Sequence, residues 1–512
     1  MKIKVLVFLI SIAFVIIFIE MYYARQITKG LPIVSINTST QLLHSRYWHM
    51  GDITVVNNLN RRDNVYYVQA RFRPRGNSTF RQEKMPFNVN FELPVSIAGF
   101  YPQTHFIFLA EYFDPSLMRN FTALHLASAM TGMLYTPYTR HVSMYINGEY
   151  QGVYLLTEHR TRIIESSTYV IELNHVAPDR SEKMNIDWIR ANNRYYMIRH
   201  QEGNMTEERG IDLSNFLIRA SNAITSQNFN LVQQYFDIDS LVDFYILREL
   251  FASHDTGMFS VFMQIIDNEE GRRIYMGPVW DFDVSAGIVN QISYIPWQEQ
   301  NWVSLPEGLA LAEFNYWFRN LIQIPEFVRA IRPRLDYMKE YALPNTIKEM
   351  WRVFETYQYD FDRNFSLHPI NHPEHAHSVE SFQKLSDQRS HIIFLENFLT
   401  TRADWLSNLF SDYLPELYFP RMYGQIDVFL NGVYIDFASH IESSRFINEK
   451  PHIQSRWLFS TLFPEYSFNQ VRSKVSHFYM PFVNWFYFIN IDVLDYLGID
   501  YEFYDETIYI FP

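Results

Sequence analysis

Two short acidic motifs contain the residues of this chain whose types and spacing suit them best to chemistry. The first is His254-Asp255 followed by Ser260, and the second is Trp280–Asp283, which reads Trp-Asp-Phe-Asp. Phosphoryl transfer needs one carboxylate to orient an attacking hydroxyl and another to hold the magnesium ion that bridges the phosphates of ATP. Protein kinases place their catalytic Asp and their metal-binding Asp in this order. The motifs therefore predict ATP chemistry, although loop Asp residues also commonly stabilise turns.

The composition indicates a folded protein and excludes several classes of function. At 512 residues the chain is long enough for a large domain and at least one smaller one. A hydrophobic content of 48% and an aromatic content of 17% argue against extended disorder. No nucleic-acid partner is expected, because the formal net charge is −13 and phosphate-backbone binding needs clustered Lys and Arg. The absence of Cys excludes disulfides, thiol nucleophiles and Cys-ligated zinc.

The N-terminus predicts a membrane anchor. Lys2 and Lys4 precede the apolar run Val5–Ile19, and Tyr22-Tyr23 supplies aromatic side chains suited to a membrane interface. No small-residue cleavage site follows, so residues 1–24 are expected to form an uncleaved transmembrane signal anchor rather than a removed signal peptide. The basic residues at the N-terminus favour an extracytoplasmic body, whereas two basic residues just beyond the segment oppose that orientation.

Alternation of polar and apolar residues predicts short strands from about Ile33 to Leu93, most clearly at 64–72 and 87–91. Two hairpins follow later in the chain. The first spans 141–156 and is centred on Asn147-Gly148, a dipeptide that favours two-residue turns. Its second strand leads to Glu158. The second hairpin has strands at 261–266 and 273–276, so it lies between the two acidic motifs.

Helices are predicted where apolar residues recur at helical spacing after a residue that can cap the first turn. The predicted helices run from Asp114 or Ser116 to about Gly132, from a cap at Asp237 or Asp239 to Leu250, and through most of 310–409. The last hundred residues change character, with an Asn-Gly hairpin at 426–437, a short helix at 491–497 and strands at 501–504 and 508–511. A domain boundary is therefore predicted near Ser411.

Four ordered segments together resemble the CotH kinase-like family, the spore-coat protein H group of atypical kinases. They carry Arg-Gly-Asn-Ser followed by Lys-x-Pro-Phe, an Asp-x-Ser-x-x-Arg-Asn element, an Asn-Gly hairpin ending in Glu, and Trp-Asp-Phe-Asp. The segments are Arg75–Phe87, Asp114–Asn120, Tyr145–Glu158 and Trp280–Asp283. The resemblance implies an α+β fold, with an atypical protein-kinase-like bilobal domain at 30–410.

The resemblance implies roles for single residues around ATP and Mg²⁺. Lys84 is expected to contact the ATP phosphates, and Glu158 to line the nucleotide site or to orient a basic residue. Asp255 is expected to be the catalytic-loop acid. Asp281 is expected to hold Mg²⁺, with Asp283 as a second metal ligand.

Two arginines and one serine complete the expected site. Arg75 and Arg119 are expected to neutralise phosphate or to support the carboxylates. Ser260 stands where the family and ordinary kinases place Asn, five residues after Asp255. A Ser hydroxyl can ligate Mg²⁺, but it is a weaker and shorter-reaching ligand than an amide carbonyl, so activity is expected to be lowered or lost. No Gly-rich or Walker motif occurs, and the turn Arg75–Thr79 is expected to help hold the phosphates through its backbone N–H groups.

The predicted function is an atypical kinase that transfers the γ-phosphoryl group of ATP to hydroxyls of surface or spore-coat-like proteins. The alternative is a non-catalytic pseudokinase that acts as an envelope or spore-surface assembly protein or as an adhesin. Because ATP is scarce outside cells, either the body faces the cytoplasm or a spore compartment, or the protein is not catalytic. Kinase-like folds also transfer other parts of a nucleotide, so nucleotidyl transfer remains open.

Two features lie outside this reading. Residues 412–512 weakly resemble the small α+β stalk-type domain at the N-terminus of copper amine oxidases, without implying copper. A histidine cluster also occurs within ten residues, and it is expected to be a solvated loop rather than a zinc or nickel site. Its members are His368, His372, His375 and His377.

Overall fold

The structure of the chain is a computed structural model. The model describes residues 30–39, 47–57, 64–76, 79–159, 168–174, 177–178, 187–192, 194–253, 259–269, 271–288, 315–370 and 380–411, and short strands between 427 and 511. The predicted anchor at 1–24, the acid Asp255 and the short helix at 491–497 lie outside the described residues. Within the described part of the chain, no helix combines the length and apolar character needed to cross a bilayer.

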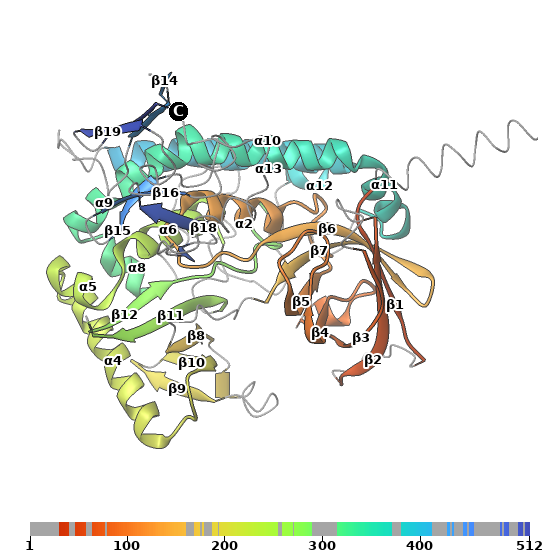
Figure 1. The fold of residues 1–512 in the computed structure, drawn as a ribbon, viewed down its shortest axis with the longest axis horizontal. Coiled ribbons are helices and arrows are strands. Elements are labelled where there is room, and N and C mark those ends of the chain that lie inside the picture. The colour runs from red at the N-terminus through yellow and green to blue at the C-terminus, as the bar shows by residue number, and fades with distance from the viewer. Residues whose placement is uncertain are drawn as a thin grey trace, which may run out of the picture.

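The first part of the chain closes into a β-barrel, which forms one side of the molecule in Figure 1. Neighbouring strands follow the order β1-β2-β3-β4-β5-β7-β6, and β1 completes the ring by pairing in parallel with β6. The strands are β1 (Ile33–Asn37), β2 (His49–Val56), β3 (Val65–Pro74), β4 (Phe87–Val95), β5 (Gln103–Leu109), β6 (Thr139–Ile146) and β7 (Glu149–Glu158). The strands expected at 64–72 and 87–91 are confirmed.

The barrel interior is a separate apolar core. Buried residues alternate with more exposed ones along parts of β3 and β4, as Phe72 and Val89 illustrate. The hairpin expected at 141–156 is also confirmed, because Asn147 and Gly148 have φ values of 50° and 85° and join β6 to β7 directly. Two successive positive φ values match the twist of a two-residue hairpin.

A second, five-stranded sheet has the order β12-β11-β8-β10-β9. The hairpin expected between the acidic motifs is confirmed as β11 and β12, whose ladder pairs Met263 with Met276. The strands are β8 (Tyr169–Leu173), β9 (Trp188–Ala191), β10 (Arg194–Gln201), β11 (Val261–Asn268) and β12 (Gly271–Met276). Ile107 on the outside of the barrel packs against Phe262 of β11 and against Trp280, so barrel and sheet meet beside the second acidic motif.

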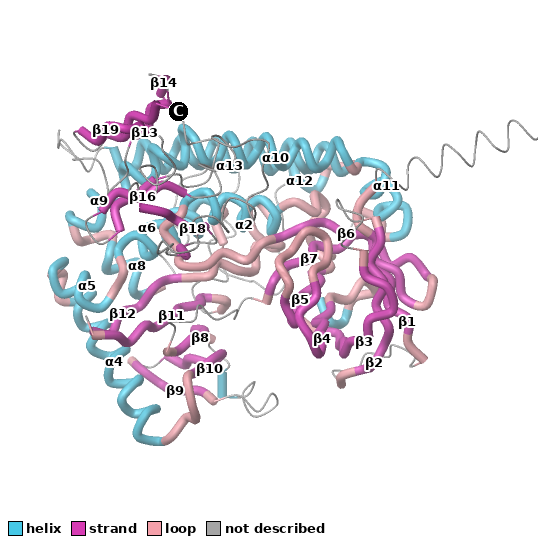
Figure 2. The backbone as a smooth tube through the Cα atoms, in the orientation of Figure 1, coloured by secondary structure: helices cyan, strands magenta, loops and turns pink. Residues whose placement is uncertain are grey.

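Helices cover the sheet and extend along one edge of the molecule, as the cyan segments of Figure 2 show. Within the described residues of 310–409, the predicted helical character is confirmed. α10 and α13 run side by side, linked by a 2.7 Å hydrogen bond from Trp351 to Glu396. The helices are α2 (Arg119–Met130), α4 (Glu207–Thr225), α5 (Phe229–Tyr235), α6 (Ile238–Leu250), α8 (Tyr316–Leu321), α9 (Pro325–Tyr337), the π-helical η5 (Met338–Ala342), α10 (Leu343–Thr356), α11 (Gln358–Leu367), α12 (Glu380–Gln383) and α13 (Gln388–Ser411).

The starts of α6 and α2 were both predicted from the sequence. α6 begins at Ile238 with Asp237 as its cap, which accepts a hydrogen bond from the Ser240 N–H at 2.9 Å. α2 begins at Arg119, later than expected, because the preceding residues form tight turns and Leu117 has a φ of 54°. The Asp114 carboxylate accepts from the backbone N–H groups of Ser116, Met118 and Arg119, so it stabilises the turn that leads into α2, while Met118 occupies the N-cap position.

The C-terminal strands form two small four-stranded sheets. The Asn-Gly hairpin expected at 426–437 is confirmed by the pairing of Leu430 with Val433. The strands are β13 (Asp427–Leu430), β14 (Val433–Tyr434), β15 (Ser444–Ile447), β16 (Lys450–Gln454), β17 (Phe482–Val483), β18 (Phe486–Asn490), β19 (Asp500–Tyr504) and β20 (Thr507–Phe511). Helices and strands thus occur largely in separate regions, as the α+β prediction requires, whereas the closed barrel was not predicted.

Candidate functional site

The ends of the two acidic motifs meet at the base of the β11–β12 hairpin. The Ser260 hydroxyl donates a 2.9 Å hydrogen bond to the Asp281 carboxylate. Ser260 is buried and Asp281 is exposed, and both have left-handed backbone conformations, with φ values of 56° and 72°. These unusual conformations turn a hydroxyl and a carboxylate toward each other at the surface. The structure thus brings together two residues that the sequence placed 21 positions apart.

Arg248 of α6 fixes the backbone of both motif ends from beneath. Its guanidinium is fully buried and donates to the Ser260 carbonyl at 3.1 Å and to the Trp280 carbonyl at 2.6 Å. It also lies over the Phe282 ring, 4.3 Å from the centroid. One side chain therefore sets the spacing between Ser260 and Asp281, and the sequence reasoning did not find it.

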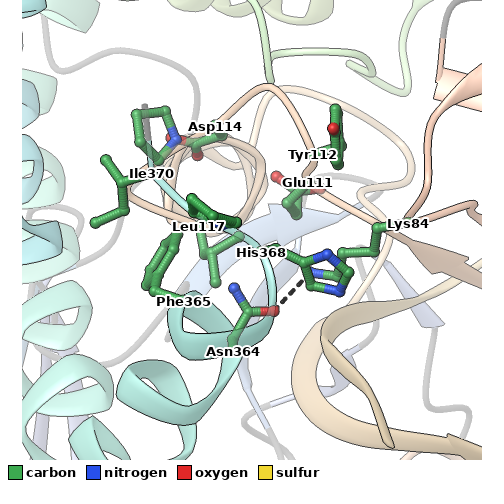
Figure 3. Close-up of a pocket in the computed structure, with 11 residues that line it drawn as sticks. Lys84, Glu111, Tyr112, Asp114, Leu117, Asn364, Phe365, His368 and Ile370 are labelled. Carbon is green, nitrogen blue, oxygen red and sulfur yellow. Dashed lines mark hydrogen bonds between the residues drawn. The ribbon is translucent and has the colours of Figure 1, made fainter. Parts of the chain in front are cut away.

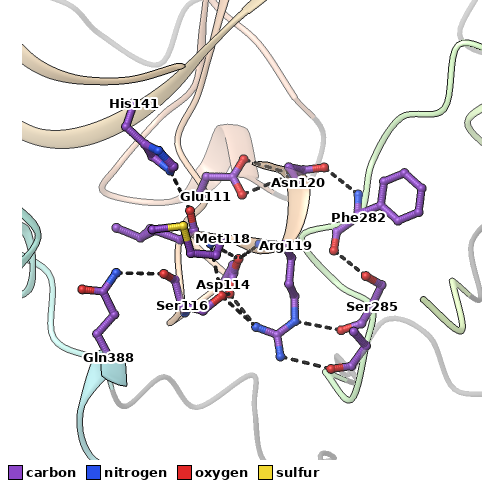
Figure 4. A network of polar contacts seen from close by, with 12 residues as sticks. Glu111, Asp114, Ser116, Met118, Arg119, Asn120, His141, Phe282, Ser285 and Gln388 are labelled. Atoms are coloured by element: carbon purple, nitrogen blue, oxygen red, sulfur yellow. Dashed lines mark hydrogen bonds and ion pairs between the residues drawn. The ribbon is translucent and has the colours of Figure 1, made fainter. Parts of the chain in front are cut away.

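Arg119, at the first position of α2, braces the segment that follows the second motif (Figure 4). Its guanidinium donates to the carbonyls of Ser285 and Ala286 at 2.9 and 3.1 Å, and to the Asp114 carboxylate at 2.6 Å. Arg119 and Asp114 are both fully buried. Of the two roles expected for Arg119, this placement matches support of the acidic loop and keeps the guanidinium away from the surface.

Asn120 links the same loop to a buried acid, Glu111. The Asn120 side-chain oxygen accepts from the Phe282 N–H at 2.8 Å, while its nitrogen donates to the two Glu111 oxygens at 3.0 and 3.2 Å. Burial raises the pKa of Glu111 well above its ordinary value, and the negative charges of Asp283 and Asp114 raise it further. Glu111 was not predicted from the sequence.

Arg75 lies near the expected metal ligands Asp281 and Asp283. Its guanidinium lies 5.7 Å from the centroid of the Trp280 ring. Burial lowers the pKa of Arg75 to about 10, while the charges of Asp281 and Asp283 oppose that shift, so Arg75 remains charged at neutral pH. Arg199 of β10 also faces this cluster, and its Nε donates to the buried Glu172 at 2.5 Å. The sequence offered no signal for this Arg199–Glu172 ion pair.

Lys84 is buried, whereas Arg75 is only partly buried. Its ammonium donates to the Val153 carbonyl at 2.5 Å and to the Asn364 side chain at 2.9 Å. It lines a cavity of about 20 Å³, the size of one water molecule, together with Glu111 and His368 (Figure 3). Burial lowers the pKa of Lys84 to about 7, against the charge of Glu111, so Lys84 loses its charge as the pH rises above neutrality.

Glu158 ends β7 inside the protein. Its carboxylate accepts a 3.1 Å hydrogen bond from the Tyr138 N–H and a 3.2 Å bond from the Tyr135 hydroxyl. These contacts tie the end of the hairpin to the segment that follows α2. The role of Glu158 in a nucleotide site stays a prediction.

The oxygen donors near the surface suit a hard cation. Within the described ranges, no group of three or more Asp, Glu or His side chains is arranged to hold a metal ion. Mg²⁺ in phosphoryl-transfer sites commonly takes only one or two carboxylates and completes its shell with phosphates and water. Asp281 and the Ser260 hydroxyl are oxygen donors in direct contact, and Asp283 shares with Asp281 the nearby cation Arg75, so the three remain the predicted ligands. Of the histidine cluster, only His368 is described, and its Nε2 lies 3.0 Å from the Gln151 carbonyl oxygen.

Comparison with protein families gives a match over most of the chain. A family model described as CotH kinase protein matches residues 72–406, which is more than half of the chain. The matched segment starts in β3, ends in α13 and contains all eight residues expected at the site. No curated protein matches the chain.

Proposed function

Because the chain belongs to the CotH kinase protein family, we propose that it is an atypical kinase that transfers the γ-phosphoryl group of ATP to hydroxyls of surface or spore-coat-like proteins. The observation that carries the proposal is the 2.9 Å contact between Ser260 and Asp281. It places two oxygen donors, one from each motif, at the same surface position. The Arg75 guanidinium faces the same carboxylates and supplies positive charge for phosphate oxygens.

The residues of the candidate site have different roles in the proposed reaction. Asp281, Asp283 and Ser260 would hold Mg²⁺, which supplies charge neutralisation to the ATP phosphates when bound. Arg75 and Lys84 would supply positive charge to the phosphates. Asp255, which lies outside the described residues, is proposed to accept the proton of the attacking hydroxyl.

We propose a kinase-like bilobal arrangement for residues 30–410. In this arrangement the barrel is one lobe, and the five-stranded sheet with its helices is the other. The packing of Ile107 against Phe262 and Trp280 supports it, because the candidate site then lies where the two lobes meet. Residues 412–512 are proposed to form a separate stalk-type domain. Residues 1–24 are proposed to anchor the protein in a membrane, with an extracytoplasmic body.

Isotopic labelling of ATP tests the proposed reaction. The purified full-length protein is incubated with magnesium and ATP carrying ³²P at either the γ or the α position. A kinase transfers label to Ser, Thr or Tyr hydroxyls of an added protein, or to its own, only from the γ position. Transfer from the α position would instead establish nucleotidyl transfer. Absence of transfer from both positions would contradict any catalytic function.

One observation favours the non-catalytic alternative, an assembly protein or adhesin that keeps the kinase-like fold. Ser260 occupies the position of a metal-binding Asn, and its hydroxyl reaches less far than an amide oxygen. For an active enzyme, Ser260→Asn is expected to leave the rate of label transfer unchanged or to raise it by up to about tenfold. The backbone at this position suits Asn, because its φ is 56° and Asn is enriched in that region.

The rate for Ser260→Asn is measured with γ-labelled ATP against wild type, and Ser260→Ala serves as the variant that removes the hydroxyl. A more than tenfold fall in Ser260→Asn, with the fold intact by circular dichroism, would contradict a metal-binding role for this position. No transfer in wild type or in Ser260→Asn would support the non-catalytic alternative.

A further inference from the structure

One face of α11 is fastened to the barrel by polar side chains spaced four residues apart. Asp360 accepts from the Leu31 N–H at 3.1 Å and from the Ser143 hydroxyl at 3.2 Å. Two helical turns further on, His368 contacts the backbone of β7 through Gln151. Residues four apart lie on the same side of a helix, so this face is a continuous polar contact with the barrel.

Asn364 occupies the middle of that face and is almost fully buried. Its side-chain oxygen accepts two hydrogen bonds, one from the Val153 N–H at 3.0 Å and one from the Lys84 ammonium at 2.9 Å. Lys84 also donates to the carbonyl of Val153. The ammonium is thus held between β7 and a residue 280 positions away in the sequence, as Figure 3 shows.

Gly152 provides independent evidence that the sequence accommodates the contact between Asn364 and Lys84. It has a φ of 106°, and a Cβ atom at this position would lie 2.6 Å from the Asn364 side-chain oxygen. The same atom would lie 3.0 Å from the Lys84 side chain. A contact of 2.6 Å essentially never occurs for a real Cβ atom, and a positive φ of this size is strained for any residue with a side chain, so Gly at this position lets Asn364 and Lys84 meet against β7.

We infer that Asn364 is a positioning residue that holds the Lys84 ammonium at the cavity beside Glu111, the acid that Asn120 links to the second acidic motif. The inference rests on the proposed function, in which Lys84 contributes charge to phosphate binding. An amide oxygen suits this task because it accepts a hydrogen bond from the ammonium without cancelling its charge. A carboxylate in the same place would form an ion pair with Lys84 and compete with phosphate.

Asn364→Asp tests the inference, because the substitution keeps the shape and both acceptor roles and adds one charge 2.9 Å from the ammonium. The pKa of Lys84 is expected to rise by about one unit or more. Other groups that face Lys84 are Glu111, His368, His141 and the Tyr154 ring, and the substitution changes none of them. Trace acetylation with acetic anhydride at a series of pH values, read by mass spectrometry of the Lys84 peptide, gives this pKa without ATP.

Asp360→Asn is the matched control, since it weakens the contact of the same helix face without touching Lys84. It is expected to leave the Lys84 pKa at its wild-type value, about 7. An unchanged pKa in Asn364→Asp, or an equal shift in Asp360→Asn, would overturn the inference, because a purely structural role would affect both variants alike.

ATP affinity gives the second measurement. Asn364→Asp is expected to raise the KM for ATP by about tenfold with little change in kcat, because ground-state phosphate binding is lost. Asp360→Asn is expected to change the KM less than about twofold. Equal KM values in wild type and Asn364→Asp would overturn the positioning role. If wild type does not use ATP, the proposed function fails, and the pKa shift still decides whether Asn364 controls the charge of Lys84.

Discussion

Asp281→Asn is expected to reduce transfer of the γ-phosphoryl label by about a hundredfold or more, because one preorganised charge at a reacting phosphate contributes on that scale. Asn is preferred to Ala for this test. The φ of Asp281 is 72°, and Asn is one of the few residues that adopt that conformation readily. Since Asp281 is exposed, its replacement is expected to shift the melting temperature little. The rate is measured with γ-labelled ATP at saturating magnesium.

Asp267→Asn is the control for Asp281→Asn. Asp267 lies on the same hairpin, at the far end of β11, where it pairs with Arg272 at the surface. Its replacement removes the same charge from the protein and is expected to leave the rate within about twofold of wild type. If Asp281→Asn retained more than a tenth of the wild-type rate, Asp281 would not be a metal ligand of the reaction.

Arg119→Met is expected to destabilise the protein by about 3–5 kcal/mol, because it leaves the Asp114 carboxylate buried without its partner. Both side chains of this ion pair are fully buried. The carbonyls of Ser285 and Ala286 also lose their donor, so the loop after the second motif is expected to loosen. Urea unfolding followed by circular dichroism measures the loss.

The surface residue Arg272 offers the comparison for Arg119. It pairs with Asp212 and Asp267 at partly exposed positions, so Arg272→Met is expected to cost about 1 kcal/mol or less. Adding Asp114→Asn to Arg119→Met is expected to restore part of the lost stability, because the unpaired charge is removed. A loss below about 1 kcal/mol in Arg119→Met would mean that this buried network does not hold the acidic loop in place.

Local elements of the fold were predictable because their causes are local. Asn147-Gly148 accommodates the two positive φ values of its turn, and Asp237 supplies the cap from which α6 starts. Closure of the barrel was not predictable in this way. It depends on parallel pairing of β1 with β6, where Ile33 meets Ser143 across more than a hundred residues of sequence. No local pattern in either strand identifies that partner.

In the candidate site, too, residues in local motifs were predictable and residues with long-range partners were not. Ser260 and Asp281 were found because each lies in a short recognisable motif. Arg248 was missed because its role depends on where α6 packs, and Arg248 is one of several charged residues in that helix. Glu111 and Asn364 were missed because their hydrogen-bond partners come from other elements of the fold. Both side chains are buried, and no local sequence pattern indicates that burial.

Isothermal titration of ATP into the purified full-length protein, with magnesium and again with EDTA, tests the proposed nucleotide site most directly. If Asp281, Asp283 and Ser260 hold magnesium for the phosphates, ATP binds with magnesium, binding weakens at least tenfold with EDTA, and Asp281→Asn loses the magnesium dependence. Absence of binding at millimolar ATP, or equal binding with and without magnesium in both proteins, would contradict a kinase site at Asp281.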